Sequence, residues 1–147
     1  MIIFATAQIE VTITTALLDS GLQMRDDHLK NPDFLDIEKY PTITFKSTKV
    51  EPLGENEYTM YGDLTIRGTT KNIRLEVRYN GMWQTPWWVE KNGEFVNEGP
   101  KPRMGFVAKG MINRHDFGVN WQGEMDGGGL VVGNEVQLVI DAEVYQE

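Results

Sequence analysis

The sequence predicts an all-β fold, an antiparallel meander barrel that carries one short helical plug near residues 23–38. Several stretches alternate apolar and polar residues with period two, which is typical of half-buried strands. Turns containing glycine or asparagine separate those stretches. Only residues 24–41 fit neither a strand nor a strand connection. The 147 residues suit a single domain, residues 1–147, with a core of useful size.

The strands are predicted from this alternation. In the first half of the chain they are Gln8–Thr14, Thr42–Val50 and Glu57–Arg67. A turn at residues 67–70 then leads into Asn72–Tyr79, and two alternating runs around a short glycine-containing turn predict a β-hairpin. Met104–Ile112 and Glu135–Val144 resume the alternation as the last strands, with a flexible turn at Gly127–Gly129 between them.

The helical segment is predicted from its capping residues. Asn31 before Pro32 has the pattern of an N-cap followed by proline at the first helical position, where no N–H is missed. Pro41 disfavours a helical conformation at Tyr40, so the helix should end before that residue. Gln23–Leu29 has room for a second helical turn. We expect this segment to close one end of the sheet.

Residues 80–101 interrupt the alternation. Glycines and prolines punctuate the segment, which also contains Trp83, Trp87 and Trp88. A long irregular connection in a compact domain is usually a lid, a binding loop or a disordered segment. Because tryptophan combines a large apolar body with one N–H, we interpret the segment as a mouth or lid, with room for a short strand around Trp87–Glu90.

Composition and charge exclude several classes of function. The formal net charge of −8 argues against a nucleic-acid surface and against an anionic membrane patch, because both need clustered Lys and Arg. The absence of cysteine excludes disulfides, thiolate catalysis and sulfur-ligated metals. No apolar run is long enough to span a bilayer, so no transmembrane segment is expected.

Candidate catalytic and metal-binding residues are few. His28 and His115 are the only histidines, and their spacing matches no metal motif. A Ser/His/Asp site would have to be assembled from scattered residues. We therefore expect no catalytic residue, no cofactor and no metal, and thermal unfolding with and without a chelator should superimpose. The alternative is a metal-dependent or carboxylate-based hydrolase acting at the barrel mouth.

Three arginines lie at predicted turns near aspartates. They are Arg25, Arg67 and Arg114, and the nearby carboxylates are Asp26, Asp63 and Asp116. Arginine pairs well with carboxylates through two parallel hydrogen bonds. We predict internal ion pairs that fix the barrel ends, and the second interpretation is recognition of a ligand headgroup.

The apolar face of the strands is the candidate binding site. An eight-stranded barrel is just wide enough either to fill with side chains or to hold one slim ligand. Small residues such as Gly62, Ala108 and Gly110 lie among large ones and should leave space for hydrocarbon. The residues alone favour a packed core and a lipid cavity about equally. The predicted ligand-binding residues are Val11, Ile13, Phe45, Leu64, Leu75, Val77, Phe106, Ala108, Ile112, Leu138 and Ile140.

Four blocks of sequence, taken in order, resemble a known family. They are Met24–Lys30 with Asp33–Asp36 and Tyr40-Pro41, Gly62–Gly68, Ile112–Arg114 with Asp116–Gly118, and Val132–Val136. Together they resemble the signature of the YceI-like family, which are lipocalin-like antiparallel β-barrels that bind polyisoprenoid lipids. The resemblance implies that the barrel interior binds a polyisoprenoid or isoprenoid-quinone-type lipid for transport, storage or sequestration, without catalysis. It also implies a role in stress response and, if a signal and the first strands are missing from this chain, a periplasmic location, with a cytoplasmic location as the alternative.

The chain departs from the family at its start. The family carries further strands before the one that corresponds to Gln8–Thr14, so we expect this strand and Glu135–Val144 to form two edges that face a gap. Unpaired edges invite strand addition. Three outcomes are open: the chain is a fragment of a longer protein, which we favour, it forms a homodimer across the gap, or the two edges pair with each other.

Overall fold

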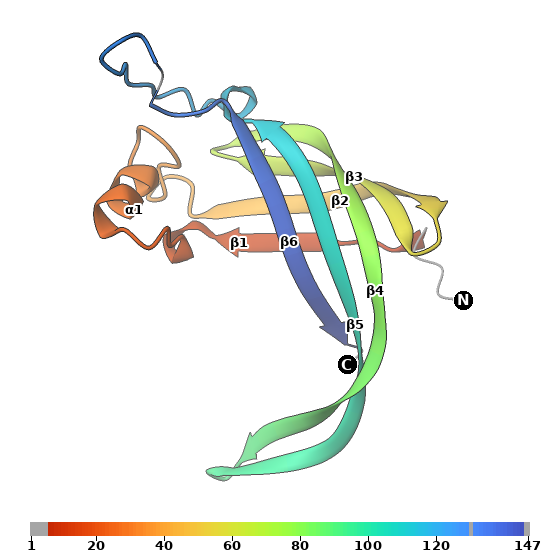
Figure 1. Cartoon of the computed structure of the whole chain (residues 1–147). Coiled ribbons are helices and arrows are strands. Elements are labelled where there is room, and N and C mark those ends of the chain that lie inside the picture. Colours follow the sequence, from red (N-terminus) through yellow and green to blue (C-terminus); the bar gives the residue numbers. More distant parts are fainter. Residues whose placement is uncertain (1–5, 130, 146–147) are drawn as a thin grey trace.

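The computed structural model describes residues 6–129 and 131–145, and its six strands form one antiparallel sheet in chain order (Figure 1). The strands are β1 (Glu10–Thr14), β2 (Thr42–Gly54), β3 (Glu57–Ile66), β4 (Thr69–Lys91), β5 (Glu94–Asn113) and β6 (Glu135–Tyr145). Two 3-10 helices, η2 (Thr15–Leu17) and η3 (Arg114–Phe117), and the helix α1 (Gln23–Lys30) lie between strands. The sheet curls into a half-barrel, which confirms the predicted all-β meander with one short helix.

The half-barrel is open between its first and last strands. Within the described residues, β1 pairs only with β2, and β6 pairs only with β5. The expected pair of unpaired edges is therefore present, and pairing of the two edges with each other is not observed in this part of the chain. The fragment and homodimer outcomes stay predictions.

The hairpin between β3 and β4 forms as predicted. Its pairs run from Ile66 opposite Thr69 to Glu57 opposite Arg78. The two turn residues, Arg67 and Gly68, have φ values of 49° and 73°. Positive φ at both central residues is the geometry that matches the twist of a two-residue hairpin. A Cβ on Gly68 would also lie 2.8 Å from Cε1 of Tyr40, so the turn packs closely against the segment before β2.

The helix lies before Asn31, and the prediction that Asn31 caps a helix starting at Pro32 was wrong. Asn31 is the C-terminal cap of α1, and its N–H donates to the carbonyl of His28 at 3.2 Å. Its side-chain oxygen accepts from the N–H of Asp33 at 2.8 Å, which makes a turn instead of a helix start. Asp36 then adopts φ 48°, a value that a right-handed helix cannot contain.

Residues 80–101 also differ from the prediction, because β4 and β5 run through them as one long hairpin. The tip is Asn92-Gly93, with φ values of 53° and 82°, a two-residue turn of the type that Asn-Gly favours. Register shifts between Tyr79 and Gly81 and between Pro86 and Trp88 break the simple alternation. These irregularities made a continuous strand look like an irregular loop in the sequence.

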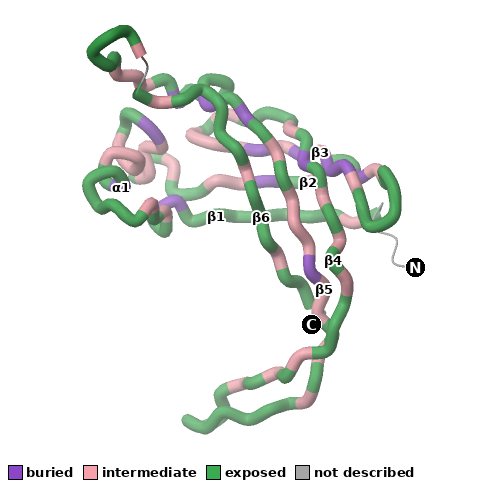
Figure 2. The backbone as a smooth tube through the Cα atoms, in the orientation of Figure 1, coloured by how far each residue is buried: buried purple, intermediate pink, exposed green. Residues whose placement is uncertain are grey.

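The hydrophobic core lies on one face of the curled part of the sheet. It comprises Phe45, Val50, Met60, Leu64, Leu75, Ile112 and Phe117. A register shift between Ser47 and Lys49 in β2 brings Val50 to the same face as Phe45, since a bulge adds one residue to the alternation. Figure 2 shows that the buried positions cluster near one end of the sheet, whereas the far end of the β4–β5 hairpin is largely exposed.

A concave apolar face as the candidate functional site

Strand register defines one continuous apolar face, which we call the concave face. Residues directly opposite each other in neighbouring strands point to the same side of a sheet. Val11 lies opposite Phe45, and Phe45 lies opposite Leu64. On the other half of the sheet, Ala108 lies opposite both Val77 and Ile140. With the period of two along each strand, every predicted ligand-binding residue falls on this face.

The predicted ligand-binding residues differ in depth. Phe45, Leu64, Leu75 and Ile112 are buried in the core. Four residues are half-buried: Val77, Phe106, Ala108 and Leu138. Val11, Ile13 and Ile140 belong to the edge strands and are 41%, 51% and 45% exposed. The concave face is thus packed at its centre and open along both edges.

The glycines of the concave face do not leave the space that we expected. A Cβ on Gly62 would lie 2.2 Å from Cζ of Phe45, so the phenyl ring crosses this position. A Cβ on Gly110 would lie 2.6 Å from Cδ2 of Leu75. The neighbouring large side chains therefore fill both positions, because contact at these distances leaves no room even for a methyl group.

The concave face includes apolar residues that the predicted set omitted. Val136 and Val144 of β6 alternate with Leu138 and Ile140 on the same side, and they are 38% and 39% exposed. Val50 and Met60 are buried in the core. The alternation of β6 predicts that Val136 and Val144 lie on this face. The position of Val50 depends on a bulge that the sequence pattern does not predict.

Arginine side chains tie the loops together at the end of the half-barrel where α1 and η3 lie. Nη1 of Arg67 donates to the carbonyls of Pro32 and Phe34, both at 2.6 Å. Arg25 binds the carbonyl and the hydroxyl of Ser20. Loop carbonyls have no sheet partner, so a guanidinium group that satisfies several of them holds the loop in place.

Arg114 is the most deeply placed of these arginines, at 5% exposed. Its Nε donates to the carbonyl of Gly133 at 2.9 Å, and its Nη1 donates to the carbonyls of Val119 and Trp121 at 2.9 and 2.7 Å. The structural role predicted for the three arginines fits this geometry. Their predicted partners were wrong, since none of them forms an ion pair with Asp26, Asp63 or Asp116 in the described residues.

An aromatic cluster joins α1 and the segment after it to the loop before β6. The ring of His28 lies 4.9 Å from that of Phe34 and 4.7 Å from that of Trp121, both edge to face. Phe34 and Trp121 are 5.4 Å apart. Aromatic pairs in such arrangements stabilise beyond the area they bury. This cluster connects the β1 side and the β6 side of the half-barrel at one end.

The titratable groups at this end make separate local contacts. Nε2 of His28 lies 3.0 Å from Oδ2 of Asp33, and the ring of His115 lies between the side-chain oxygens of Asn120 and Asn134. Asp26 accepts from the hydroxyl and the N–H of Ser20. The hydroxyl hydrogen bond is the main cause that lowers the pKa of Asp26 below its ordinary value of 3.8, against an opposing effect of burial.

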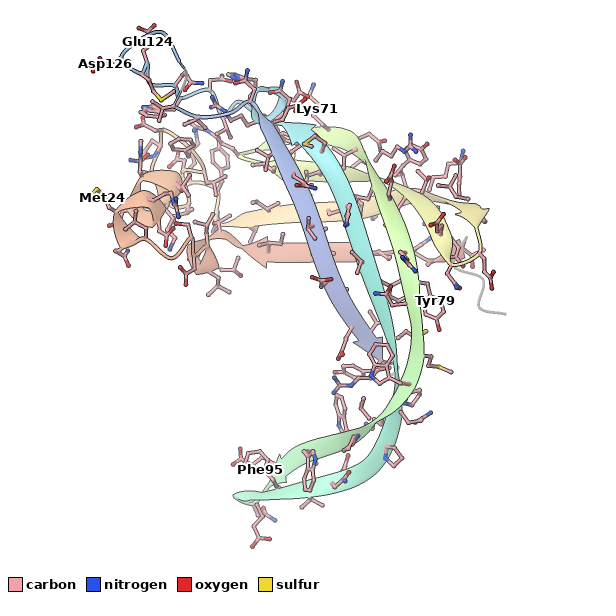
Figure 3. The ribbon with its side chains drawn as sticks, in the orientation of Figure 1. Met24, Lys71, Tyr79, Phe95, Glu124 and Asp126 are labelled. Carbon is pink, nitrogen blue, oxygen red and sulfur yellow. The ribbon has the colours of Figure 1, made fainter. Side chains whose placement is uncertain are left out.

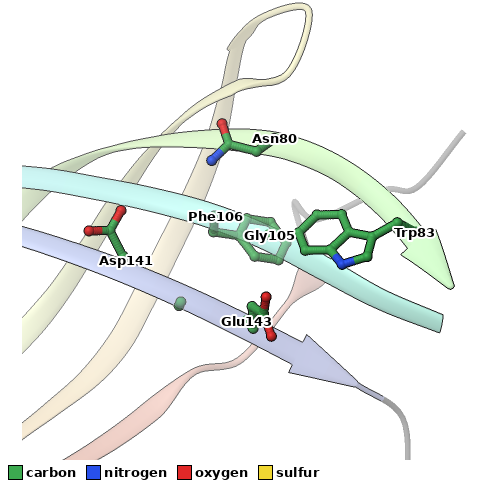
Figure 4. A pocket seen from close by; sticks show the side chains of 7 residues that line it. Asn80, Trp83, Gly105, Phe106, Asp141 and Glu143 are labelled. Carbon is green, nitrogen blue, oxygen red and sulfur yellow. The ribbon is translucent and has the colours of Figure 1, made fainter. Parts of the chain in front are cut away.

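Two of the hollows on the described surface lie along β4 and β5. One, of about 230 Å³, is lined by Asn80, Trp83, Gly105, Phe106, Asp141, Ala142 and Glu143 (Figure 4). The other, of about 570 Å³, is lined by four charged side chains, Glu57, Glu76, Arg78 and Lys109, together with Leu53, Tyr58, Val77, Asn80 and Val107. Of the predicted ligand-binding residues, Phe106 lines the first of these two hollows and Val77 lines the second. A continuous tunnel along the concave face stays a prediction.

The described residues contain no cluster of three or more His, Cys, Asp or Glu side chains arranged to hold a metal ion. None of their helices has the length and apolar character needed to cross a bilayer.

Known proteins are similar to this chain in sequence. Protein YceI of Escherichia coli O157:H7 is 37% identical over 143 residues, which cover 97% of this chain and 65% of that protein. A UPF0312 protein of Pseudomonas putida (strain W619) is 38% identical over 117 residues, which cover 80% of this chain and 55% of that protein. The chain therefore spans 55–65% of the length of these relatives.

Solved structures show the same architecture. The crystal structure of the Campylobacter jejuni YCEI protein matches with a TM-score of 0.74 and 28% identity, over 96% of this chain and 73% of that chain. Burkholderia cenocepacia BcnA matches in fold, with a TM-score of 0.68 and 24% identity over 95% of this chain and 76% of that chain. Residues 3–144 match the model of the YceI-like domain. With its curled antiparallel sheet and these relatives, the chain belongs to the YceI-like family.

Proposed function

We propose that the concave face binds the hydrocarbon chain of a lipid, as a carrier or sequestering protein and without catalysis. One observation carries this proposal. Every strand contributes apolar side chains to a single face, and that face stays exposed at both edges, at Val11 and Ile13 of β1 and at Val136, Ile140 and Val144 of β6. A contiguous exposed apolar surface on a folded protein usually marks a binding site.

The physical driving force is the burial of apolar surface. A methylene group that moves from water to an apolar site contributes roughly 0.8 kcal/mol. A long polyisoprenoid or isoprenoid-quinone-type lipid could lie along the open edges and cover them. The family resemblance supports this lipid class, and it also supports a periplasmic location, which fractionation of cells that express the chain would test.

The open half-barrel would hold such a lipid better if a second chain closed it. Among the described strands, the outer edges of β1 and β6 have no strand partner, and such edges accept strands from another chain. We therefore propose a homodimer across the gap as the lipid-binding form of the isolated chain. Sedimentation velocity should show a dimer, and a monomer that still binds lipid would contradict this arrangement.

Ala108→Phe tests whether the concave face is the lipid site. Ala108 is half-buried between Val77 and Ile140, so a phenyl ring at this position would occupy the space available to a ligand. The matched control is Val139→Phe, because Val139 lies one residue from Ile140 on the opposite face and is 55% exposed. We expect Ala108→Phe to weaken binding of a fluorescent isoprenoid probe at least tenfold, with unchanged far-ultraviolet circular dichroism.

The outcome separates the two faces. Val139→Phe should bind the probe like the parent chain. Equal affinity of Ala108→Phe and the parent would remove the concave face as the lipid site. Native mass spectrometry of protein purified without detergent gives a second measurement, since a retained lipid identifies itself by its mass.

A further inference from the structure

The far part of the β4–β5 hairpin projects from the sheet as a two-stranded ribbon, which we call the arm (residues 84–102). The last described pair with β6 is Arg103 opposite Tyr145, and the last pair with β3 is Glu57 opposite Arg78. Beyond these pairs, the described residues of β4 and β5 form strand pairs only with each other, over roughly 30 Å at about 3.3 Å per residue. Figure 1 shows the arm bending away from the curled sheet. An isolated two-stranded ribbon is marginally stable in water, so its exposed surface requires an explanation.

The root of the arm is braced by its own side chains. The ring of Trp87 lies 4.5 Å from that of Tyr145, and Nζ of Lys101 lies 4.7 Å from the centre of the Trp87 ring. Arg103 stacks near the same ring at 5.2 Å and pairs with Glu143 at 2.6 Å. Cation–π contacts of this kind stabilise an exposed site modestly. Trp87 therefore has a packing role that fixes the arm to the end of β6.

The tip of the arm carries aromatic side chains that are largely exposed. Trp88 is 60% exposed and Phe95 is 73% exposed. Trp88 lies opposite Asn97, and Phe95 lies opposite Glu90, which places Trp88 and Phe95 diagonally on one face of the ribbon. Figure 3 shows Phe95 near the tip of the arm. Large aromatic groups gain little from this exposure unless a partner covers them.

Charge and backbone chemistry indicate what this partner is. The arm holds Glu90, Glu94 and Glu98 against Lys91 and Lys101, a formal charge of −1 within a chain of −8. Lys91 and Glu98 also form an ion pair at 2.5 Å. The tip is thus nearly neutral, whereas the rest of the chain is acidic. A neutral aromatic tip suits an uncharged or zwitterionic surface, and an anionic surface would repel the chain as a whole.

Prolines disfavour the competing explanation, in which another strand pairs with the arm. Pro86 lies opposite Pro100, and Pro102 lies opposite Gln84. Proline has no N–H to donate, and in edge strands it discourages strand addition. A partner would therefore bind the aromatic side chains of the arm and not its backbone edges.

We propose that the tip of the arm, through Trp88 and Phe95, contacts the headgroup region of a zwitterionic lipid bilayer. Tryptophan combines an apolar body with a polar N–H and concentrates at the interface between lipid and water. In the part of the chain that the structure describes, the outer edges of the ribbon have no strand partner, so the arm is not expected to enter the hydrocarbon core. The contact brings the concave face to a bilayer from which a lipid can be taken. Its purpose, though not its test, rests on the lipid-binding function proposed above.

The test uses the full chain with vesicles of phosphatidylcholine. Flotation should recover the parent chain with the vesicles, and the double variant Trp88→Ser/Phe95→Ser should partition at least tenfold less. The control is Leu17→Ser/Met24→Ser, since Leu17 and Met24 are 80% and 81% exposed outside the arm. This control should bind within twofold of the parent. Vesicles with 30% phosphatidylglycerol should bind the parent chain more weakly at low salt.

A second measurement does not depend on the double variant being folded. Lipids with brominated acyl chains near the headgroup should quench the tryptophan fluorescence of the parent chain more than that of Trp88→Phe. The proposal is overturned if the parent chain ignores phosphatidylcholine vesicles, if the tip variant binds like the parent, or if quenching is unchanged in Trp88→Phe.

This result is separable from the lipid site. Ala108→Phe should still bind vesicles while it loses the isoprenoid probe in detergent. The tip variant Trp88→Ser/Phe95→Ser should bind the isoprenoid probe in detergent but lose vesicle binding. Loss of both activities in the tip variant, with its fold intact, would contradict a role limited to membrane contact.

Discussion

Replacement of Arg114 by methionine should destabilise the protein and leave lipid affinity nearly unchanged. The guanidinium group is buried and donates three hydrogen bonds to the carbonyls of Gly133, Val119 and Trp121. A hydrogen bond from a charged donor contributes about 1.5–3 kcal/mol. Against this, Arg114→Met removes a buried charge and its Nη2 atom, which has no hydrogen-bond partner among the described residues. We expect a net loss of about 2–4 kcal/mol, which is a large part of the ~5–15 kcal/mol typical of a domain.

Urea unfolding measures this loss. The midpoint should fall while the slope of unfolding free energy against urea stays constant, because the surface exposed on unfolding hardly changes. Arg74→Met is the matched control, since the side chain of Arg74 is 57% exposed and lies 3.9 Å from Glu76. Its effect should stay within about 0.5 kcal/mol. If Arg114→Met unfolds like the parent but binds the isoprenoid probe tenfold more weakly, Arg114 contacts the ligand headgroup and the structural argument fails.

Two more substitutions test the packing and the pH dependence. Gly62→Ala should lower the free energy of unfolding by about 1–3 kcal/mol, because its methyl group would overlap the Phe45 ring and the Lys46 carbonyl. Adding Phe45→Leu to the same chain should recover part of this loss in urea unfolding. If the effects of the two substitutions simply add, the two side chains do not contact each other. Asp26→Asn should lower the melting temperature at pH 7. Since the folded pKa of Asp26 is lowered, its charge stabilises the fold above 3.8 and this contribution disappears as the pH falls through the folded value. The difference from the parent should therefore shrink in acid, whereas Asp27→Asn should differ little at any pH, and a constant difference for Asp26→Asn would contradict the linkage.

Local sequence patterns predicted the regular strands correctly. They were wrong where the same residue type can occur in two different local structures. The alternation of Gln8–Thr14 and the hairpin around Arg67-Gly68 needed only strand periodicity and a turn. The helix start predicted at Asn31 was wrong because an asparagine side chain can cap a helix or close a turn. Which of the two forms depends on the contacts of the loop that follows. The arm was missed because its prolines and glycines occupy bulges and free edges, where strands tolerate them.

The candidate site shows the same division. Period two placed the predicted residues on a common face, but it could not say which of them a curled sheet would bury. Phe45 fills the space over Gly62 only because their strands pair in this register. Likewise, the sequence neighbours of Arg114 suggested a carboxylate partner, whereas the folded chain gives it three backbone carbonyls, those of Val119, Trp121 and Gly133.

The chain-order pairing of the strands has a consequence for kinetics. The β3–β4 hairpin closes through a two-residue turn, whereas β1 pairs with β2 across residues 15–41 and β5 pairs with β6 across residues 114–134. The two edge pairings should therefore form later in folding than this hairpin. The same arrangement lets the sheet open one strand at a time from β1 or β6, since no described strand bridges these ends. Amide hydrogen exchange should therefore be slowest in β3 and the first half of β4 and faster towards both edges. The edge strands β1 and β6, which carry the exposed part of the concave face, are therefore also expected to separate from the sheet first when the protein opens locally.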